Sequence, residues 1–152
     1  MQKFRLATLL KIREQERDQA AQRVMDARNA IEKLQSSRKE VLEENDRMNT
    51  FRKESSQGAV NMQNILESQR FQMLLMAQVQ QLDDHLGKLQ QELERRESVL
   101  LQAQQSVKSL EKLRDQKIEK YQSAENHRMQ ERTDEWASVR FAKDIQSTSH
   151  HP

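Results

Sequence analysis

The sequence predicts an all-α fold, a long antiparallel two-helix coiled-coil hairpin whose second helix is longer than its first. Three observations lead to this prediction. Apolar residues recur at alternating steps of four and three through two long segments, which is the spacing of a coiled-coil seam. A single stretch of small polar residues separates the two segments. Helix breakers are scarce, since the 152 residues include one proline, at Pro152, and two glycines.

The composition argues against a compact globule and against several classes of function. Hydrophobic residues make up 34%, charged residues 33% and aromatic residues 4% of the chain, so a thin seam is easier to build than a thick core. The formal charge of +2 comes from interspersed acidic and basic residues, which is typical of solvated helix faces and indicates no nucleic-acid partner. Without cysteine or an apolar run of ~20 residues, we expect a cytoplasmic protein.

We expect the first helix to span about residues 3–53. Its seam includes polar residues, which weaken a coiled coil locally and restrict its register. The seam positions are Leu6, Leu10, Arg13, Arg17, Ala20, Val24, Ala27, Ile31, Leu34, Arg38, Val41, Asn45 and Met48.

The turn is expected at about residues 54–61, where small polar residues surround Gly58. We expect Gly58 to adopt the left-handed conformation that often ends a helix. A rival turn at residues 83–87 is rejected, because the seam continues through it from Leu82 to Leu89.

The second helix is expected over about residues 62–143 and has the more regular seam. Arg96 is its one polar interruption between Leu75 and Leu110. The seam positions are Leu75, Val79, Leu82, Leu86, Leu89, Leu93, Arg96, Leu100, Ala103, Val107, Leu110, Arg114, Lys117, Tyr121, Ala124 and Arg128.

A turn near residue 57 predicts that facing residues have numbers that sum to about 115. The first helix would then cover the second only to about residues 110–115. The ~30 residues that follow would extend beyond it as a single helix of ~45 Å. We expect one coiled-coil domain over residues 1–145 and a disordered tail over residues 146–152.

Residues that could carry catalysis or bind a metal are scattered. The adjacent acidic pairs at 83–84 and 134–135 point about 100° apart on a helix, and His85 and His127 are isolated. His150 and His151 lie on the expected tail. We therefore expect a protein that is not an enzyme and has no cofactor, metal, nucleic-acid or small-molecule partner.

Two apolar patches lie beside the seam, and each is either a wider local core or a docking surface for a partner. Near the turn, Phe71, Leu74 and Met76 flank Leu75, and Leu42 and Phe51 lie on the facing helix. At the other end, Phe4, Leu9 and Ile12 widen the first helix, as Leu113 and Ile118 widen the second. We define the tip patch, as a candidate for binding a partner, by Leu42, Phe71, Leu74 and Leu75.

Both ends of the sequence resemble the FliJ family of the bacterial flagellar type III export apparatus. The similarity lies in residues 4–14 (FRLATLLKIRE) and 110–117 (LEKLRDQK), followed by Tyr121. It continues through Arg128, Arg132, Asp134, Glu135 and Arg140. The length, the glycine-containing turn and the longer second helix also agree, and the resemblance extends to about residue 141.

The resemblance implies a coiled coil similar to the central stalk of rotary ATPases, without hydrolytic activity of its own. Its implied partners are the hexameric export ATPase, the membrane export gate and the chaperones of late flagellar substrates. Such a protein would couple the ATPase to the gate at the cytoplasmic face of the inner membrane, at the flagellar base. The tip patch would meet the gate or a chaperone. The implied ATPase end comprises Phe4, Arg13, Leu113, Tyr121, Arg128, Arg132, Asp134, Glu135, Trp136 and Arg140.

Two other functions have the same fold. One is the equivalent stalk of a virulence type III secretion system, and the other is a general structural coiled-coil scaffold. The Asp134, Glu135 and Arg140 pattern favours the flagellar family. The oligomeric state stays open, because a hairpin buries its seam within one chain and a dimer buries it between two. We expect a monomer in preference to a homodimer.

Overall fold

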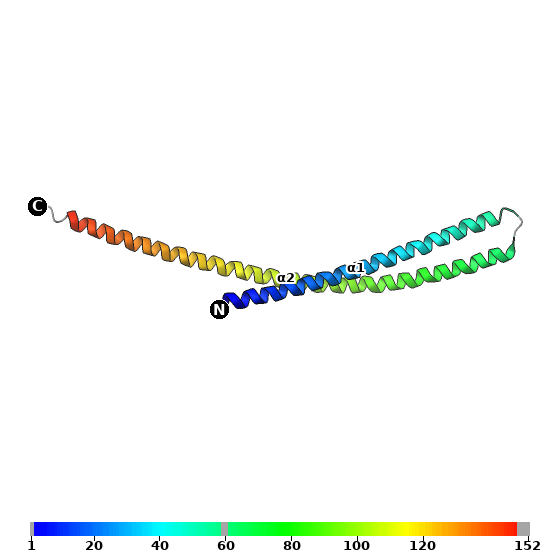
Figure 1. Ribbon diagram of the computed structural model, residues 1–152, viewed down its shortest axis with the longest axis horizontal. Helices are drawn as coiled ribbons and strands as arrows, with labels where there is room; N and C mark the ends of the chain where they lie inside the picture. The colour runs from blue at the N-terminus through cyan, green and yellow to red at the C-terminus, as the bar shows by residue number, and fades with distance from the viewer. Residues whose placement is uncertain (1, 59–60, 149–152) are drawn as a thin grey trace. The chain divides into compact units, whose positions relative to one another are not determined.

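The computed structural model describes residues 2–58 and 61–148, and the side chains from Arg5 onward. It contains two helices in these ranges, α1 (Gln2–Ser55) and α2 (Met62–Thr148), and no strand (Figure 1). α2 has 87 residues and α1 has 54. The predicted all-α hairpin with a longer second helix is confirmed.

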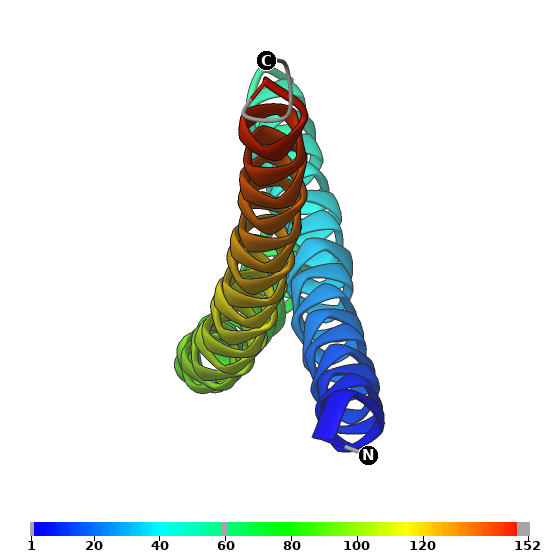
Figure 2. The ribbon, with the colours of Figure 1, turned by 90° about the vertical axis from the view of Figure 1, so that its left-hand side faces the viewer.

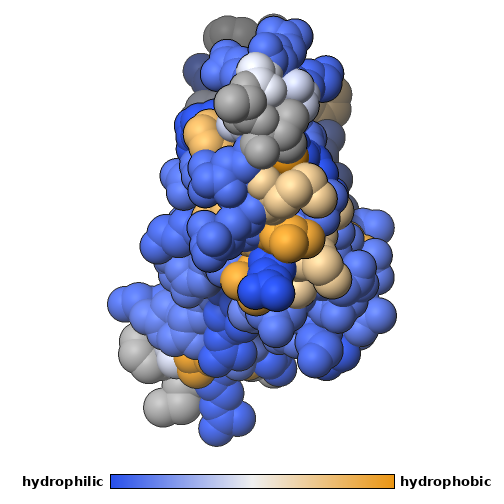
Figure 3. Space-filling view, turned by 90° about the vertical axis from the view of Figure 1, so that its right-hand side faces the viewer, coloured by the Kyte–Doolittle hydropathy of each residue, from blue (hydrophilic) through white to orange (hydrophobic). Residues whose placement is uncertain are grey.

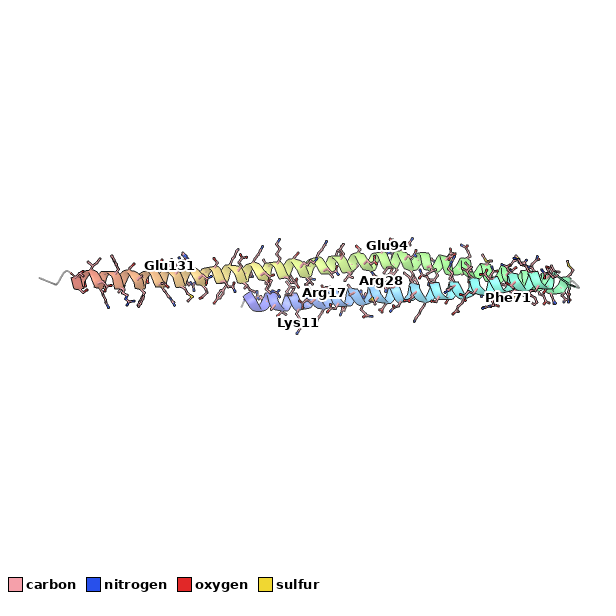
Figure 4. All side chains as sticks on the ribbon, turned by 90° about the horizontal axis from the view of Figure 1, so that it is seen from above. Lys11, Arg17, Arg28, Phe71, Glu94 and Glu131 are labelled. Carbon is pink, nitrogen blue, oxygen red and sulfur yellow. The ribbon has the colours of Figure 1, made fainter. Side chains whose placement is uncertain are left out.

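The chain divides into two units, which we describe separately. The hairpin unit is Ile12–Gln105, and the terminal unit combines Met1–Lys11 with Ser106–Pro152. In the hairpin unit α1 and α2 run side by side and antiparallel, as the views in Figure 1 and Figure 4 agree. The expected single domain over residues 1–145 stays a prediction.

The buried core coincides with the predicted seams. All nine buried hydrophobic residues of the described chain are seam positions. Several are alanine or valine, and such small side chains let two helices approach closely while burying little area. They are Leu10, Ala20, Val24, Ala27, Ile31, Leu75, Val79, Leu86 and Val107.

Polar contacts between the helices show the register of the hairpin unit. Arg96 is a seam residue whose Nη1 donates to the backbone oxygen of Arg23 at 2.8 Å. The Nε of Arg38 donates to Oδ1 of Asp83 at 2.6 Å. Arg96 can occupy a seam position because its guanidinium donates a hydrogen bond to a backbone carbonyl of the facing helix. The aliphatic part of an arginine side chain can lie along apolar surface at such a position.

The observed register differs by a few residues from the expected one. The residue numbers of the cross-helix hydrogen-bonded pairs sum to between 117 and 125, rather than to about 115. The reason is the position of the turn, because α1 ends at Ser55 and α2 begins at Met62. The midpoint of the reversal therefore lies after residue 57, on which the expectation rested.

The end of α1 corrects the prediction for Gly58. No glycine in the described ranges has a positive φ, so Gly58 is not a left-handed cap. Instead, the amide of Ser56 donates to the oxygen of Arg52 at 3.1 Å, and the amide of Gln57 donates to the oxygen of Glu54 at 3.3 Å. A connection of several residues allows this gradual ending, since the chain need not reverse within the last turn of α1.

Asn61 caps the start of α2. Its side-chain Oδ1 accepts from the amide of Gln63 at 3.1 Å, and its backbone oxygen accepts from the amide of Ile65 at 3.3 Å. Asparagine at this position satisfies amides that a helix start otherwise leaves without an acceptor.

The C-terminal end of α2 extends further than expected. We expected the helix to end near residue 143 and a disordered tail to start at residue 146, but α2 continues to Thr148. The hydroxyls of Ser147 and Thr148 each donate to the backbone oxygen of Asp144 at 2.9 Å, which satisfies an acceptor near the helix end. The rest of the expected tail, with His150 and His151, lies outside the described residues.

Candidate partner-binding surfaces

Early in α2, the stretch from Phe71 to Leu82 carries no charge, although a third of the chain is charged. Its apolar side chains point in all directions. Leu75 is buried, whereas Met73 is 73% and Leu74 is 64% exposed. A helix that is apolar on every side is normally covered on every side. Within the hairpin unit α1 covers one side of this stretch, so the remaining apolar surface is open to a partner.

Two grooves lie at this end of the hairpin unit, each lined by both helices. The amide groove has a volume of about 590 Å³, and the phenylalanine groove one of about 410 Å³. The amide groove is lined by Asn45, Asn49, Arg52, Gln69, Gln72, Met73 and Met76. The phenylalanine groove is lined by Met48, Phe51, Asn64, Glu67, Ser68 and Phe71. Figure 3 faces this end and shows apolar side chains gathered among hydrophilic ones.

An amide network joins the two helices beside these grooves. The Nε2 of Gln72 donates to Oδ1 of Asn49 at 2.5 Å and lies 3.5 Å from the backbone oxygen of Asn45. Nη2 of Arg52 donates to the same Oδ1 of Asn49 at 2.9 Å. Polar residues in a coiled-coil seam specify register at some cost in stability. The tip of the hairpin thus holds polar groups between its helices and presents apolar groups outward.

The predicted tip patch is only partly brought together. Phe71 is 38% exposed in the phenylalanine groove, near the turn end of the hairpin (Figure 4). Leu74 is largely exposed and Leu42 is half-buried. Leu75 is only 6% exposed and belongs to the seam, so it supports the fold. Sequence reasoning missed Met73, although the missing charge around it is a signal that could have identified it.

The terminal unit has its own small core and groove. Leu10 and Val107 are buried there. A groove of about 260 Å³ is lined mainly by apolar atoms of Leu6, Ala7, Leu10, Arg114, Lys117 and Ile118. Leu9 and Leu113 are each about two-fifths exposed, so part of the apolar surface at this end is left open.

Beyond this core, α2 is exposed along its whole remaining length. Every residue from Lys112 to Thr148 is exposed except the half-buried Glu125. Large apolar side chains are among them, including Tyr121 at 59%, Trp136 at 65% and Phe141 at 68%. Figure 2 faces the C-terminal end of this part of α2. We call residues 118–145 the overhang.

Two contacts along the overhang involve ionisable side chains. The guanidinium carbon of Arg140 lies 5.1 Å from the centre of the Trp136 ring. Such a cation–π contact contributes ~0.5–1 kcal/mol at an exposed site, so it favours an arrangement in which the cation stays beside the ring. Nε2 of His127 lies 3.2 Å from Oε1 of Glu131 one turn later.

The residues predicted for the ATPase end fall into different units. Arg13 lies in the hairpin unit and pairs with Glu16 of its own helix at 2.9 Å. The side chain of Phe4 lies outside the described side chains. The remaining eight are all exposed on α2 in the terminal unit: Leu113, Tyr121, Arg128, Arg132, Asp134, Glu135, Trp136 and Arg140.

The described side chains of these surfaces offer apolar packing and ion pairs. Within residues 2–58 and 61–148, no three His, Asp or Glu side chains gather as ligands for a metal ion. No helix in these ranges combines the length and apolar character needed to cross a bilayer.

Comparison with protein families finds a match to the family described as Flagellar FliJ protein, over residues 1–145. The matched range includes both grooves of the hairpin unit and the whole overhang. Comparisons with curated proteins and with solved structures find no match.

Proposed function

The chain belongs to the FliJ family and is a component of the flagellar export apparatus, and from this premise we propose that it is a non-enzymatic coiled-coil stalk. It couples the export ATPase hexamer to the export gate and assists the export of flagellar substrates with their chaperones. The observation that carries the proposal is the overhang, a continuous helix whose large apolar side chains are exposed.

The overhang supports the ATPase as partner of the terminal unit. An isolated helix is marginally stable in water, even when its residues favour helix. This segment has no glycine or proline. Its exposed Tyr121 and Trp136 are of residue types that often contribute most of the binding energy in protein interfaces. A hexameric ATPase that grips this helix, as rotary ATPases grip a central stalk, would cover it.

The uncharged stretch of α2 supports a second partner at the tip of the hairpin unit. Met73 and Met76 line the amide groove, and methionine adapts its shape to more than one partner. The export gate and the helical surfaces of late-substrate chaperones are the partners that we assign to this end. Binding to the gate would hold the protein at the cytoplasmic face of the inner membrane.

The protein acts as a monomer in this proposal. Ile31 and Leu75 are buried within a single hairpin, so the seam needs no second copy of the chain. A monomer leaves the outward apolar residues near the turn available for the gate or a chaperone.

A reconstitution experiment tests the coupling role. The full chain is mixed with the export ATPase and the cytoplasmic part of the gate protein, and the complexes are separated by size-exclusion chromatography. We expect one complex that contains all three. A Phe71→Ala, Leu74→Ala variant should lose the gate and keep the ATPase. Mutually exclusive binding of the ATPase and the gate would contradict a coupling stalk.

A further inference from the structure

Most of the large exposed apolar residues of the overhang share one face of α2. At roughly 100° per residue, five of them lie within about 60° of the direction of Trp136. Their exposed fractions lie between 42% and 65%. They are Ile118, Tyr121, Met129, Trp136 and Val139. We call this surface the Trp136 face. Phe141 and Ile145, which are equally exposed, lie toward the opposite side.

The charges of the overhang are sorted about the same face. Four of its five basic residues lie on the half of the helix centred on Trp136, and four of its six acidic residues lie on the other half. The basic residues on the Trp136 half are Arg128, Arg132, Arg140 and Lys143. The acidic residues on the other half are Glu119, Glu131, Asp134 and Glu135.

Side-chain contacts agree with this sorting. Arg140 lies over the Trp136 ring, with its guanidinium carbon 5.1 Å from the ring centre, so one cation borders the apolar face directly. On the other half, Glu131 pairs with His127 at 3.2 Å. The overhang thus presents a mainly apolar and basic face, on which Glu125 and Asp144 are the acidic exceptions, and behind it a mainly acidic face.

We propose that the Trp136 face is the contact face of the overhang, and that the partner surface is an apolar groove rimmed by carboxylates. This inference rests on the proposed function, in which the export ATPase grips the overhang, and it adds which face is gripped and by what chemistry. Complementary charge steers and orients the two surfaces, while the central aromatic ring supplies apolar contact.

An anionic membrane is the other surface that a basic apolar face can bind. The acidic half of the overhang argues against it. Helices that lie in a membrane interface have polar faces rich in lysine and arginine, whereas the polar side here carries Glu119, Glu131, Asp134 and Glu135. A protein groove fits better, because it contacts one face and leaves the acidic half in water.

Two matched pairs of variants of the full chain test the proposal. Trp136→Ala is compared with Phe141→Ala, because the two aromatic residues are 65% and 68% exposed on different sides of one helix. Arg132→Glu is compared with Lys120→Glu, which makes the same charge change on the other half. Binding to the export ATPase is measured by titration calorimetry at two salt concentrations, with circular dichroism to check that each variant is folded.

We expect Trp136→Ala to weaken binding about 30-fold or more, as for the anchor residue of an interface, and Phe141→Ala less than about threefold. Arg132→Glu should weaken binding more than Lys120→Glu, and the difference should shrink at high salt. Equal losses within each pair would overturn the contact face while leaving the proposed function intact. No binding by the wild-type chain would overturn both.

Vesicles provide the test of the membrane alternative. The wild-type chain is mixed with vesicles of phosphatidylcholine and anionic phosphatidylglycerol and sedimented. We expect no binding that depends on Trp136. Binding to these vesicles that Trp136→Ala abolishes, together with unchanged binding of that variant to the ATPase, would overturn the proposal.

Discussion

Leu74 and Leu75 are adjacent leucines of α2 with opposite environments. Replacing each by alanine distinguishes a side chain that stabilises the fold from one that lies on the surface. Leu75 is 6% exposed in the seam, and Leu74 is 64% exposed. Leu→Ala removes three carbons, at ~0.8 kcal/mol for each buried one. In proportion to burial, Leu75→Ala should lower the free energy of unfolding by about 2–3 kcal/mol. Leu74→Ala should lower it by less than about 1 kcal/mol.

Urea unfolding of each full-length variant, followed by far-ultraviolet circular dichroism, measures the two losses. The pair is well matched, because both substitutions make the same change in side chain and in helix propensity one residue apart. A change in the slope of free energy against urea would indicate that the overhang unfolds separately. In that case, hydrogen exchange of peptides from the hairpin unit supplies the comparison. Equal losses for the two variants would refute the assignment of seam and surface.

Two further predictions concern the hairpin unit. Gly87→Ala should raise the free energy of unfolding by about 0.5–1 kcal/mol, because Gly87 lies within α2 and an added Cβ meets no atom within 4 Å. Thermal denaturation measures this gain in stability. A loss of stability would show that the site has no room for the added methyl group. A chain with Ile31→Cys and Leu89→Cys, which face each other in the observed register, should form a disulfide within one chain. Non-reducing electrophoresis detects it, and crosslinks formed only between chains would contradict the monomeric hairpin.

The seam was predictable because a coiled coil demands one simple regularity. A helix repeats every 3.6 residues, so apolar residues at steps of four and three must share one face. Leu10, Val24, Leu86 and Val107 illustrate this, since each was placed in the seam from spacing alone and each is buried. The helical state itself followed from the scarcity of glycine and proline.

The turn and the register were less predictable, because they depend on local choices that spacing does not determine. Gly58 can adopt a left-handed conformation, but the hydrogen bonds of Ser56 and Gln57 end α1 without it. The register then follows from where the reversal is centred. A difference of a few residues at the turn therefore shifts every facing pair, including Arg38 with Asp83.

The positions of the candidate surfaces along the chain were predictable, but the residues that form each surface were not. Exposed aromatic residues such as Phe71 and Trp136 stand outside the seam and can be found from spacing. Whether neighbouring residues share a groove depends on both helices together, as for Met73 and Met76 in the amide groove. Leu75 is a predicted seam position that the tip patch also included, and its burial leaves it in the seam. The groove that we propose for the overhang would belong to a partner, so its shape is not encoded in this chain. The residues assigned to partners stay predictions.

The central claim is that the overhang engages the export ATPase, and a truncation tests it most directly. A chain that ends at Asp115 lacks the whole overhang but keeps all of Ile12–Gln105. The measurement is the rate of ATP hydrolysis by the export ATPase with the full or the truncated chain, with circular dichroism to check that the hairpin is folded. We predict that the full chain stimulates hydrolysis and that the truncated chain, although folded, does not. Undiminished stimulation by the truncated chain would contradict the account.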